Sequence, residues 1–400
     1  MAAVTANIKC NSASSDGRLS SKKSCKKIWF SKNPVGCGIR RSAMLGGVAV
    51  RQKGKGKHMS KRIILADPRG FCAGVDRAIL TVQTILKSVP QRGGLDGLPP
   101  VYVRRQIVHN RHVVEELASQ GAVFVEELDE IPDAAASANI PVVFSAHGVS
   151  PLVKAEAKRR GLNVIDATCP LVGKVHREVL RFVREGYEIV YIGHLGHDEA
   201  VGVVGESPEH VHLIEHEGDV AKLDFQPGTK LVLLTQTTLS VDETAGTIAA
   251  LRQRFPWIEM PPSSDICYAT SNRQAAVKLV AERSDCVVIV GSANSSNSVR
   301  LMEVGQEGLD ARFAAPDAPA RTGACGQAHR VDDAGELDPA WFEGVEAVGV
   351  SSGASVPEMY VEGVVAALRA RGYTGMESVE TTKENMHFVL PAELRRQVAR

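Results

Sequence analysis

The sequence lacks three features that would point to common classes of protein. No apolar run approaches the roughly 18 residues that a membrane-spanning helix needs, so we expect no membrane span. No C-x-x-C pair occurs among the eight cysteines, which argues against a zinc ribbon or finger. Neither a GxxxxGK[ST] pattern nor a GxGxxG fingerprint after a strand is present, so ordinary nucleotide cofactors are poorly supported.

Acidic residues are nearly missing from residues 1–58, which contain 13 Lys and Arg residues but only one acidic residue, Asp16. This stretch carries a net charge of +12, and because the whole chain carries +1, the remainder carries −11. A body with this negative charge repels nucleic-acid phosphates, so we expect no nucleic-acid partner. We interpret residues 1–58 as a basic, disordered leader: a transit peptide, a mistaken start or an added leader before Met59. No secretory signal is present, which favours a reducing compartment: the cytoplasm, or a plastid or other organelle if the leader is a transit peptide.

Beyond residue 60, short β-branched runs alternate with helical patterns, as in RIILA followed by DRAILTVQTIL. This order is typical of α/β proteins with parallel sheets. Five apolar runs end in small polar residues: VVFSAHG, IVYIGHLGH, LVLLTQTT, VVIVGSANSSNS and AVGVSSGAS. Ligands bind outside the carboxyl ends of strands in such sheets, so these five clusters are candidates for one shared site.

A weak internal repeat relates three cysteines, each preceded by an aspartate and followed by a helical pattern. The cysteines are spaced 97 and 98 residues apart, and their aspartates 99 residues apart: Cys72, Cys169 and Cys267, with Asp67, Asp166 and Asp265. The spacing suggests three similar units, each placing a thiol near a strand-to-helix junction. We expect α/β domains at residues 61–169, 170–266 and 267–392, with a pseudo-threefold arrangement that brings the sulfurs together.

Three thiols at helix N-termini suit a metal or a metal cluster, because the helix amides lower the thiol pKa and thiolate is the ligand form. Buried, inert cysteines are the commoner alternative, and we interpret Cys286 in DCVVIV that way. The polar junctions around Cys72 and Cys169 favour a ligand role. A 4Fe-4S cluster held by only three thiolates would leave one iron free to coordinate a substrate oxygen.

Histidines and one acid lie at the ends of strand-like segments, in IVHN, FSAHG and IGHLGH: His109, His147, His194, His197 and Glu199. Isolated histidines are usually structural, but four in such clusters suggest a site. Imidazolium pairs with diphosphate, and a desolvated carboxyl group can donate a proton. We therefore predict Glu199 as the proton donor, with His197 orienting it or binding substrate.

Hydroxyl and amide groups in GSANSSNS and SSGASVPE could bind a small anion, although polar loop residues are an equal alternative for each segment alone. The candidates are Ser295, Ser296, Asn297 and Ser355. Thr237 and Thr238 in LTQTTLS are weaker candidates for the same face.

Taken together, these motifs resemble the LytB/IspH family of 4-hydroxy-3-methylbut-2-enyl diphosphate reductases, which act in the non-mevalonate isoprenoid pathway. The resemblance covers residues 61–392 and includes PRGFCAGVDRA, DATCPLV, GHLGH, TQTTLSVDET and DICYATSNRQ in order. It implies three α/β domains in a trefoil around one 4Fe-4S cluster on Cys72, Cys169 and Cys267. It also implies a small allylic diphosphate substrate and a ferredoxin or flavodoxin type of electron donor.

The resemblance assigns roles to the remaining candidates. It implies that the diphosphate is bound by His109, His147, Ser295, Ser296, Asn297 and Ser355. It implies that His197, Glu199 and Thr237 face the allylic hydroxyl, which leaves as water after two electrons and protons enter. The products would be isopentenyl and dimethylallyl diphosphates.

Asp198 departs from this family's pattern, which usually has proline between the histidine and the glutamate, and its carboxylate could alter the pKa of the donor. Residues 307–328 are also longer and less regular than the family implies, and we interpret Cys325 there as incidental. Two other functions stay open. The first is an iron-sulfur hydro-lyase, which would need no reductant. The second is a non-enzymatic iron-sulfur or anion-binding module, in which the strand-end clusters would not have to form one site.

Overall fold

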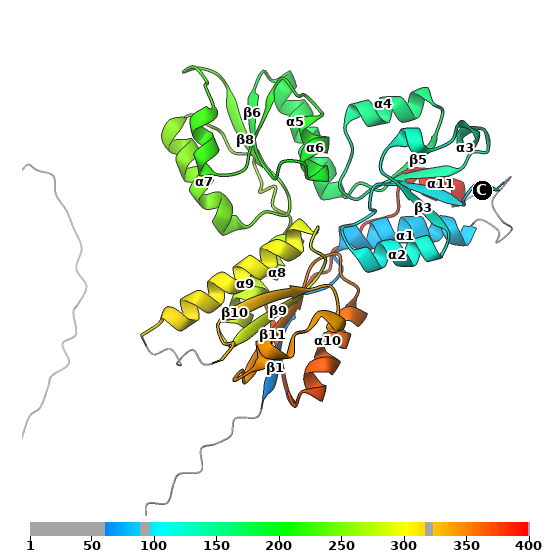
Figure 1. Ribbon diagram of the computed structural model, residues 1–400. Coiled ribbons are helices and arrows are strands. Elements are labelled where there is room, and N and C mark those ends of the chain that lie inside the picture. The colour runs from blue at the N-terminus through cyan, green and yellow to red at the C-terminus, as the bar shows by residue number, and fades with distance from the viewer. Residues whose placement is uncertain (1–60, 89–96, 317–322, 399–400) are drawn as a thin grey trace, which may run out of the picture. The chain divides into compact units, whose positions relative to one another are not determined.

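The computed structural model describes residues 61–88, 97–316 and 323–398. They belong to one compact unit, Lys57–Arg400, and the predicted leader at residues 1–58 lies outside the described residues. No helix in the described ranges is both long and apolar enough to span a membrane. The unit contains three parallel β-sheets, each packed against helices (Figure 1).

The largest sheet has five strands in the order β10-β9-β11-β1-β12. They are β1 (Arg62–Asp67), β9 (Cys286–Val290), β10 (Gln327–Val331), β11 (Ala347–Ser352) and β12 (Gly375–Glu380). Side chains alternate along β1, so Ile63 and Leu65 pack with one set of helical residues and Ile64 and Ala66 with another. The helices of this part are α8 (Tyr268–Ala281), α9 (Ser296–Ala314) and α10 (Glu358–Ala370).

The second sheet has four strands in the order β3-β2-β4-β5. They are β2 (Val101–Arg104), β3 (Ala122–Val125), β4 (Pro141–Phe144) and β5 (Asn163–Asp166). Val101 and Val103 pack toward the first helices of the chain, whereas Tyr102 between them belongs to the core on the other face. Helices of this part are α1 (Ala73–Ser88), α2 (Arg111–Ser119), α3 (Asp133–Ser137), α4 (Pro151–Arg159) and the C-terminal α11 (Ala392–Val398).

The third sheet has three strands in the order β7-β6-β8. They are β6 (Glu188–Ile192), β7 (Val211–Ile214) and β8 (Leu231–Thr235). Helices α5 (Pro170–Arg184) and α6 (Asp198–Val204) pack on the face that includes Tyr191, and α7 (Val241–Arg254) packs on the other face. Short 3-10 helices also occur: η2 (Leu128–Glu130), η3 (Glu217–Lys222), η4 (Ala334–Glu336) and η5 (Pro339–Phe342).

The predicted α/β class with parallel sheets is confirmed, because every strand pair between named strands in the described chain is parallel. The domain boundaries stay a prediction. Strand β1 lies between β11 and β12, so the first predicted domain contributes a strand to the sheet formed by the third.

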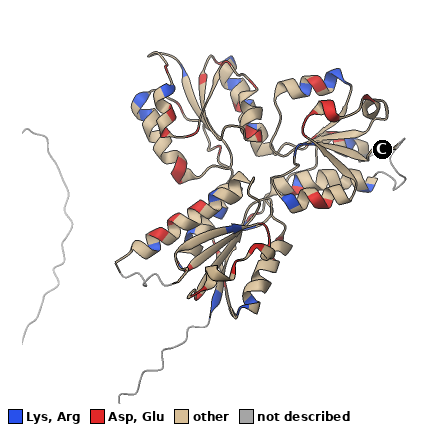
Figure 2. Cartoon of the chain, viewed as in Figure 1, with Lys and Arg blue, Asp and Glu red and all other residues tan. Residues whose placement is uncertain are grey.

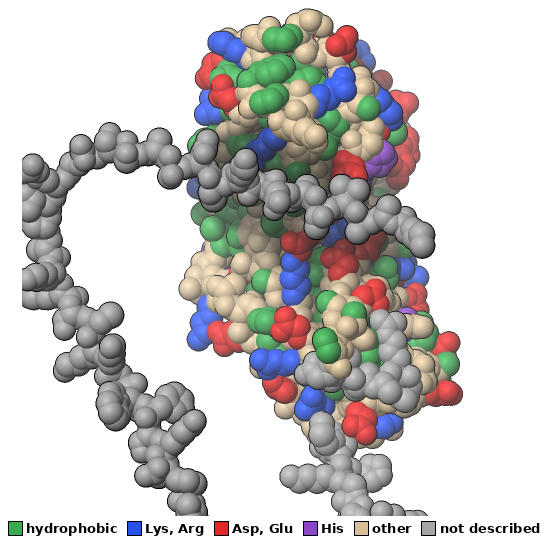
Figure 3. Space-filling view, turned by 90° about the vertical axis from the view of Figure 1, so that its left-hand side faces the viewer, with side chains coloured by type: hydrophobic (Ala, Val, Ile, Leu, Met, Phe, Trp, Pro, Cys, Tyr) green, Lys and Arg blue, Asp and Glu red, His purple; other side chains and the backbone are tan. Residues whose placement is uncertain are grey.

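The cysteine repeat is only partly regular. Cys72 and Cys169 each follow a strand and precede a helix, as expected. Cys267 also precedes a helix, α8, but the preceding element is α7 rather than a strand. Basic and acidic side chains are interspersed along the helices, and the face seen in the space-filling view mixes both signs with apolar residues (Figures 2 and 3).

Candidate active site

One cavity brings together residues that follow strands of all three sheets. Its lining includes all twelve residues predicted to bind metal or substrate or to donate a proton: Cys72, Cys169, Cys267, His109, His147, His197, Glu199, Thr237, Ser295, Ser296, Asn297 and Ser355. Most of them follow the carboxyl end of a parallel strand, where ligands bind in open α/β sheets. About 100 Å³ of the cavity is open to a water-sized group, so it has room for a small ligand only.

The thiol side of the cavity consists of Cys72, Cys169 and Cys267. Cys169 is the N-cap residue of α5, Cys267 is the N-cap residue of α8, and Cys72 directly precedes α1. A Cβ atom on Gly74 would lie 2.6 Å from the sulfur of Cys169 and 3.9 Å from that of Cys72. The two sulfurs therefore face the same point, and glycine leaves room for them. None of the three cysteines forms a disulfide.

Two arginine side chains, one fully buried and one partly buried, hold the loops that carry these thiols. The guanidinium of Arg273, fully buried, donates to the carbonyl of Gly70 at 2.7 Å and pairs with Glu384 at 3.0 Å. Arg77 donates to the carbonyls of Ala167 and Thr168, each at 3.0 Å. Cys72 and Cys169 thus lie on loops whose main-chain carbonyls are held by arginine side chains.

The thiol pKa values differ from expectation. Burial raises the pKa of Cys169 to about 12 and that of Cys267 to about 11, although amide groups, such as that of Leu171 for Cys169, act in the opposite direction. The predicted lowering is therefore wrong for these two thiols in the polypeptide alone, because burial outweighs the helix amides. A metal cation stabilises the thiolate form directly. The sulfur of Cys72 raises the pKa of both other thiols, and three thiols this close together are a donor set that fits a metal cluster.

The histidine side of the cavity consists of His109, His147 and His197. The rings of His109 and His147 stack at 3.9 Å between centroids, and His197 meets His109 edge-on at 5.3 Å. Both ring nitrogens of His109 and Nε2 of His197 are buried without a hydrogen-bond partner among the described residues. Such atoms are costly to bury unpaired, so they indicate a place for a polar ligand. His194, the fourth candidate histidine, is not part of the cavity lining.

These imidazoles are neutral in the polypeptide alone. Burial lowers the pKa of His109 and of His147, and lowers that of His197 to about 4. Nδ1 of His197 accepts a hydrogen bond from the backbone N–H of Glu199 at 3.1 Å, so its proton lies on Nε2, which is a donor. An anion in the cavity would raise these pKa values by favouring the charged form.

Glu199 lies in the first turn of α6 with only 1% of its surface exposed. Thr237 fixes its carboxyl group, with the backbone N–H and the hydroxyl each donating at 2.8 Å. Burial raises the pKa of Glu199 to about 7, more than the hydrogen bonds from Thr237 lower it. The carboxyl group can therefore carry a proton near neutrality. Thr237 orients this group, whereas His197 contacts only the Glu199 backbone.

The serine and asparagine candidates surround the start of α9. Ser295 is the N-cap residue of this 19-residue helix and accepts a hydrogen bond from the backbone N–H of Ser298. Both polar atoms of the Asn297 side chain are buried without a partner among the described residues. Ser355 donates to the carbonyl of His109 at 3.0 Å, which links this group to the histidine side. A helix N-terminus with unpaired polar groups is suited to an anion.

Two residues near the site were not predicted. Tyr191 lies in buried strand β6, and burial together with the charge of Glu199 raises its pKa well above the usual value. A tyrosine within the otherwise aliphatic run IVYI was the available signal. Arg105 forms an ion pair with Asp198, 93 positions away, and nothing in the sequence linked them. The prediction that His109, in IVHN, lies at the end of a strand is wrong, because β2 ends at Arg104, five residues earlier.

These features define a parallel α/β enzyme with one cavity that combines thiols, histidines and a buried acid. Residues 63–369 match the family model described as LytB protein. The chain therefore belongs to the LytB family, and the predicted resemblance is confirmed.

Similar proteins of known name agree with this family. A 4-hydroxy-3-methylbut-2-enyl diphosphate reductase of Bifidobacterium longum is 78% identical over 342 residues, 85% of this chain and 94% of the relative. One of Mycolicibacterium paratuberculosis is 53% identical over 84% of this chain and 92% of its own length. The solved E-1-hydroxy-2-methyl-but-2-enyl-4-diphosphate reductase of Plasmodium falciparum is similar with a TM-score of 0.75 and 35% identity, covering 85% of this chain and 98% of that one.

Proposed function

We propose that this protein is an iron-sulfur reductase that converts 4-hydroxy-3-methylbut-2-enyl diphosphate to isopentenyl and dimethylallyl diphosphates. Each turnover replaces a C–O bond with a C–H bond, consumes two electrons and two protons, and releases water. The convergence of three thiols, a protonatable acid and unpaired histidines on one cavity carries the proposal. The names of its relatives support it.

One 4Fe-4S cluster is the proposed cofactor, with Cys72, Cys169 and Cys267 as its ligands. When bound, it supplies electrons and an iron that lacks a protein ligand. The protein's own contribution is to hold three thiols in a buried place, with Arg273 and Arg77 fixing two of their loops. No fourth cysteine lines the cavity among the residues that the structure describes, which favours substrate chemistry over simple electron transfer.

The diphosphate group is proposed to bind between the histidine side and the start of α9. His109 and Asn297 offer buried polar atoms that lack a partner among the described residues, and the same space is lined by His147, Ser295, Ser296 and Ser355. Charge on the ligand would be balanced by protons taken up on the imidazoles and by the positive end of the α9 dipole.

Protonation of the substrate is assigned to Glu199. Its raised pKa keeps the carboxyl group protonated up to about pH 7, and Thr237 holds it at a fixed orientation. His197 presents its Nε2–H donor to the same space and is proposed to bind the allylic hydroxyl. Together these groups place a proton beside the leaving oxygen and stabilise its departure.

The electron donor is proposed to be a ferredoxin or flavodoxin that docks transiently. The three cysteines at the proposed cluster site are free thiols, and this agrees with a reducing compartment such as the cytoplasm. No cofactor beyond the single cluster is invoked.

An anaerobic assay of the cluster-loaded protein with 4-hydroxy-3-methylbut-2-enyl diphosphate and a chemical reductant tests this function. We expect both isoprenoid diphosphates to form only when the reductant is present. Turnover without reductant would instead favour a hydro-lyase. A protein that shows cluster absorbance near 400 nm but no turnover would refute the proposed reaction.

A further inference from the structure

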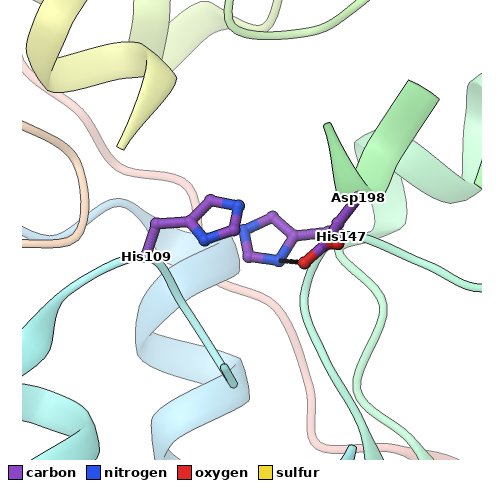
Figure 4. A group of neighbouring side chains, drawn as sticks. All are labelled: His109, His147 and Asp198. Carbon is purple, nitrogen blue, oxygen red and sulfur yellow. Dashed lines mark ion pairs between the residues drawn. The ribbon is translucent and has the colours of Figure 1, made fainter. Parts of the chain in front are cut away.

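Asp198 is the position at which the sequence departs from the family pattern, and its carboxylate faces the histidine side of the cavity. One oxygen accepts a hydrogen bond from the guanidinium of Arg105. The other oxygen lies 3.9 Å from Nδ1 of His147 (Figure 4). The Asp198 side chain is only 14% exposed, so this arrangement is shielded from bulk solvent.

The charge of Asp198 acts on the histidines and not chiefly on the proton donor beside it in the sequence. Asp198 raises the pKa of His109 and of His197, against the larger lowering caused by burial. The pKa of Glu199 responds to burial, to Thr237 and to the charge of Asp265. Asp198 is not among the main causes of the pKa shift of Glu199, whereas it is a cause for two of the histidines.

Arg105 makes a carboxylate tolerable beside an anion site. Its guanidinium bridges Asp198 and Glu127, and these two carboxylates raise its pKa despite burial. Arg105 follows β2 and has a φ of 54°, a left-handed conformation that is uncommon for a residue with a side chain. The pair thus ties the loop that leads to His109 to the first turn of α6.

A cation is the alternative ligand for this group, since one ligand atom each of His109, His147 and Asp198 lies within 4.8 Å of the others. Two observations favour an anion. Arg105 already occupies one oxygen of Asp198. The two imidazoles stack with an interplanar angle of 15°, so their rings lie face to face and do not converge edge-on on one point (Figure 4).

We propose that Arg105 and Asp198 form a positioning pair that orients His147 and enables the stacked histidines to take up a proton when a diphosphate binds. This inference rests on the proposed function. In the bound state the proton resides on the His109 and His147 pair, and the other nitrogens are available to the ligand. Nδ1–H of His147, which contacts the Ser145 hydroxyl at 3.4 Å, then lies beside the Asp198 carboxylate at 3.9 Å. Other titratable or charged groups around the pair are His197 and Glu199 of the α6 segment, Arg105 and Glu127, and the thiols of Cys72 and Cys169.

Isothermal titration calorimetry of the anaerobically purified, cluster-loaded protein with inorganic diphosphate tests the pair. Titrations at pH 6 and pH 8, in buffers that differ in ionisation enthalpy, give both the affinity and the number of protons taken up. For the unaltered protein we expect net proton uptake at pH 8. Asp198→Asn should lower the affinity about tenfold at pH 8, the scale of one hydrogen bond to a charged group, and reduce proton uptake. The loss should shrink at pH 6.

Three further variants separate positioning from general damage. Asp198→Glu should restore most of the proton uptake, because it keeps the carboxylate. Arg105→Gln should weaken binding at both pH values, because the charge of Asp198 is then unbalanced. Glu188→Gln is the matched control: Glu188 also pairs with two histidines, His210 and His212, but outside the cavity, so affinity and proton uptake should stay unchanged.

Equal or tighter diphosphate binding by Asp198→Asn at pH 8, or proton uptake equal to that of the unaltered protein, would overturn the positioning role while leaving the proposed function intact. If the unaltered protein binds Zn²⁺ but no diphosphate, the proposed substrate site fails, and this inference fails with it.

Discussion

The thiol side and the histidine side of the cavity are built in opposite ways. On the thiol side, polar atoms have partners: the sulfur of Cys267 accepts from the Thr270 amide at 3.4 Å, and Arg273 supports the loop before Cys72. On the histidine side, both nitrogens of His109 and both polar atoms of Asn297 are buried and unpaired within the described chain. One side is already fixed by the protein, and the other is completed only by a ligand.

This difference has an energetic meaning. Each unpaired buried polar group costs roughly 1–3 kcal/mol of stability, a cost that a ligand removes by supplying the missing hydrogen bond. The thiol side has a different cost, since burial and the nearby sulfur of Cys72 disfavour the thiolate forms of Cys169 and Cys267 until a metal is bound. Glu199 belongs to neither group, because Thr237 satisfies its oxygens while burial keeps it protonated.

The largest effect should follow from a change on the thiol side. Cys169→Ser replaces a sulfur ligand with a hydroxyl, which is a much poorer ligand for iron, so we expect the cluster to be lost and turnover with it. Iron content per chain and absorbance near 400 nm measure the loss.

Cys325→Ser is the matched control for that substitution, because the Cys325 sulfur lies outside the cavity and donates to the carbonyl of Gly344. It should retain the iron content of the unaltered protein. Equal iron in the Cys169→Ser protein would remove Cys169 from the proposed ligand set.

A smaller but still large effect is expected at Glu199. Glu199→Gln preserves shape and hydrogen-bonding capacity but cannot release a proton, so turnover should fall by about 100-fold to 10,000-fold while the cluster remains. The rate with reductant and the cluster absorbance are the two readouts. Glu188→Gln, a matched change far from the cavity lining, should keep the normal rate. Normal turnover by the Glu199 variant would exclude it as the proton donor.

The pH dependence of this group has a definite sign. Burial raises the folded-state pKa of Glu199 from the usual 4.5 to about 7. Its contribution to stability is therefore unchanged below pH 4.5, declines as pH rises from 4.5 to about 7, and stays lost above that range. The rate should also fall above about pH 7 as the proton is released. Chemical unfolding at pH 5 and pH 8 should show a smaller pH effect for Glu199→Gln.

The sequence predicted the membership of the site well, because most candidate residues follow a strand, and strand ends are visible as apolar runs that stop at small polar residues. Cys72, His147 and Thr237 are examples, each a few residues beyond the end of a strand. Parallel pairing then places such ends on one edge of a sheet. The convergence of the three sheets was expected from the cysteine spacing and from the family resemblance.

Contacts between loops could not be predicted in this way. Thr237 lies 38 positions from Glu199 and Asp198 lies 93 from Arg105, and both pairings depend on loop conformations that local patterns do not specify. The pairing of β1 with β11 and β12 was missed because segments distant in sequence are joined in one sheet. The thiol pKa values were misjudged because the extent of burial is a tertiary property.

The smallest of these effects should come from the histidine side, where one group among several is changed. His109→Phe keeps a ring that can stack on His147 but removes both unpaired nitrogens. A hydrogen bond to a charged group contributes roughly 1.5–3 kcal/mol, so we expect inorganic diphosphate to bind about 10- to 100-fold more weakly. The cluster should remain, because the thiol side is unchanged. Calorimetric titration gives the affinity, and iron content checks the second expectation. Loss of iron together with diphosphate binding would show that the two sides are not independent, and unaltered diphosphate affinity would show that the unpaired nitrogens of His109 serve another ligand.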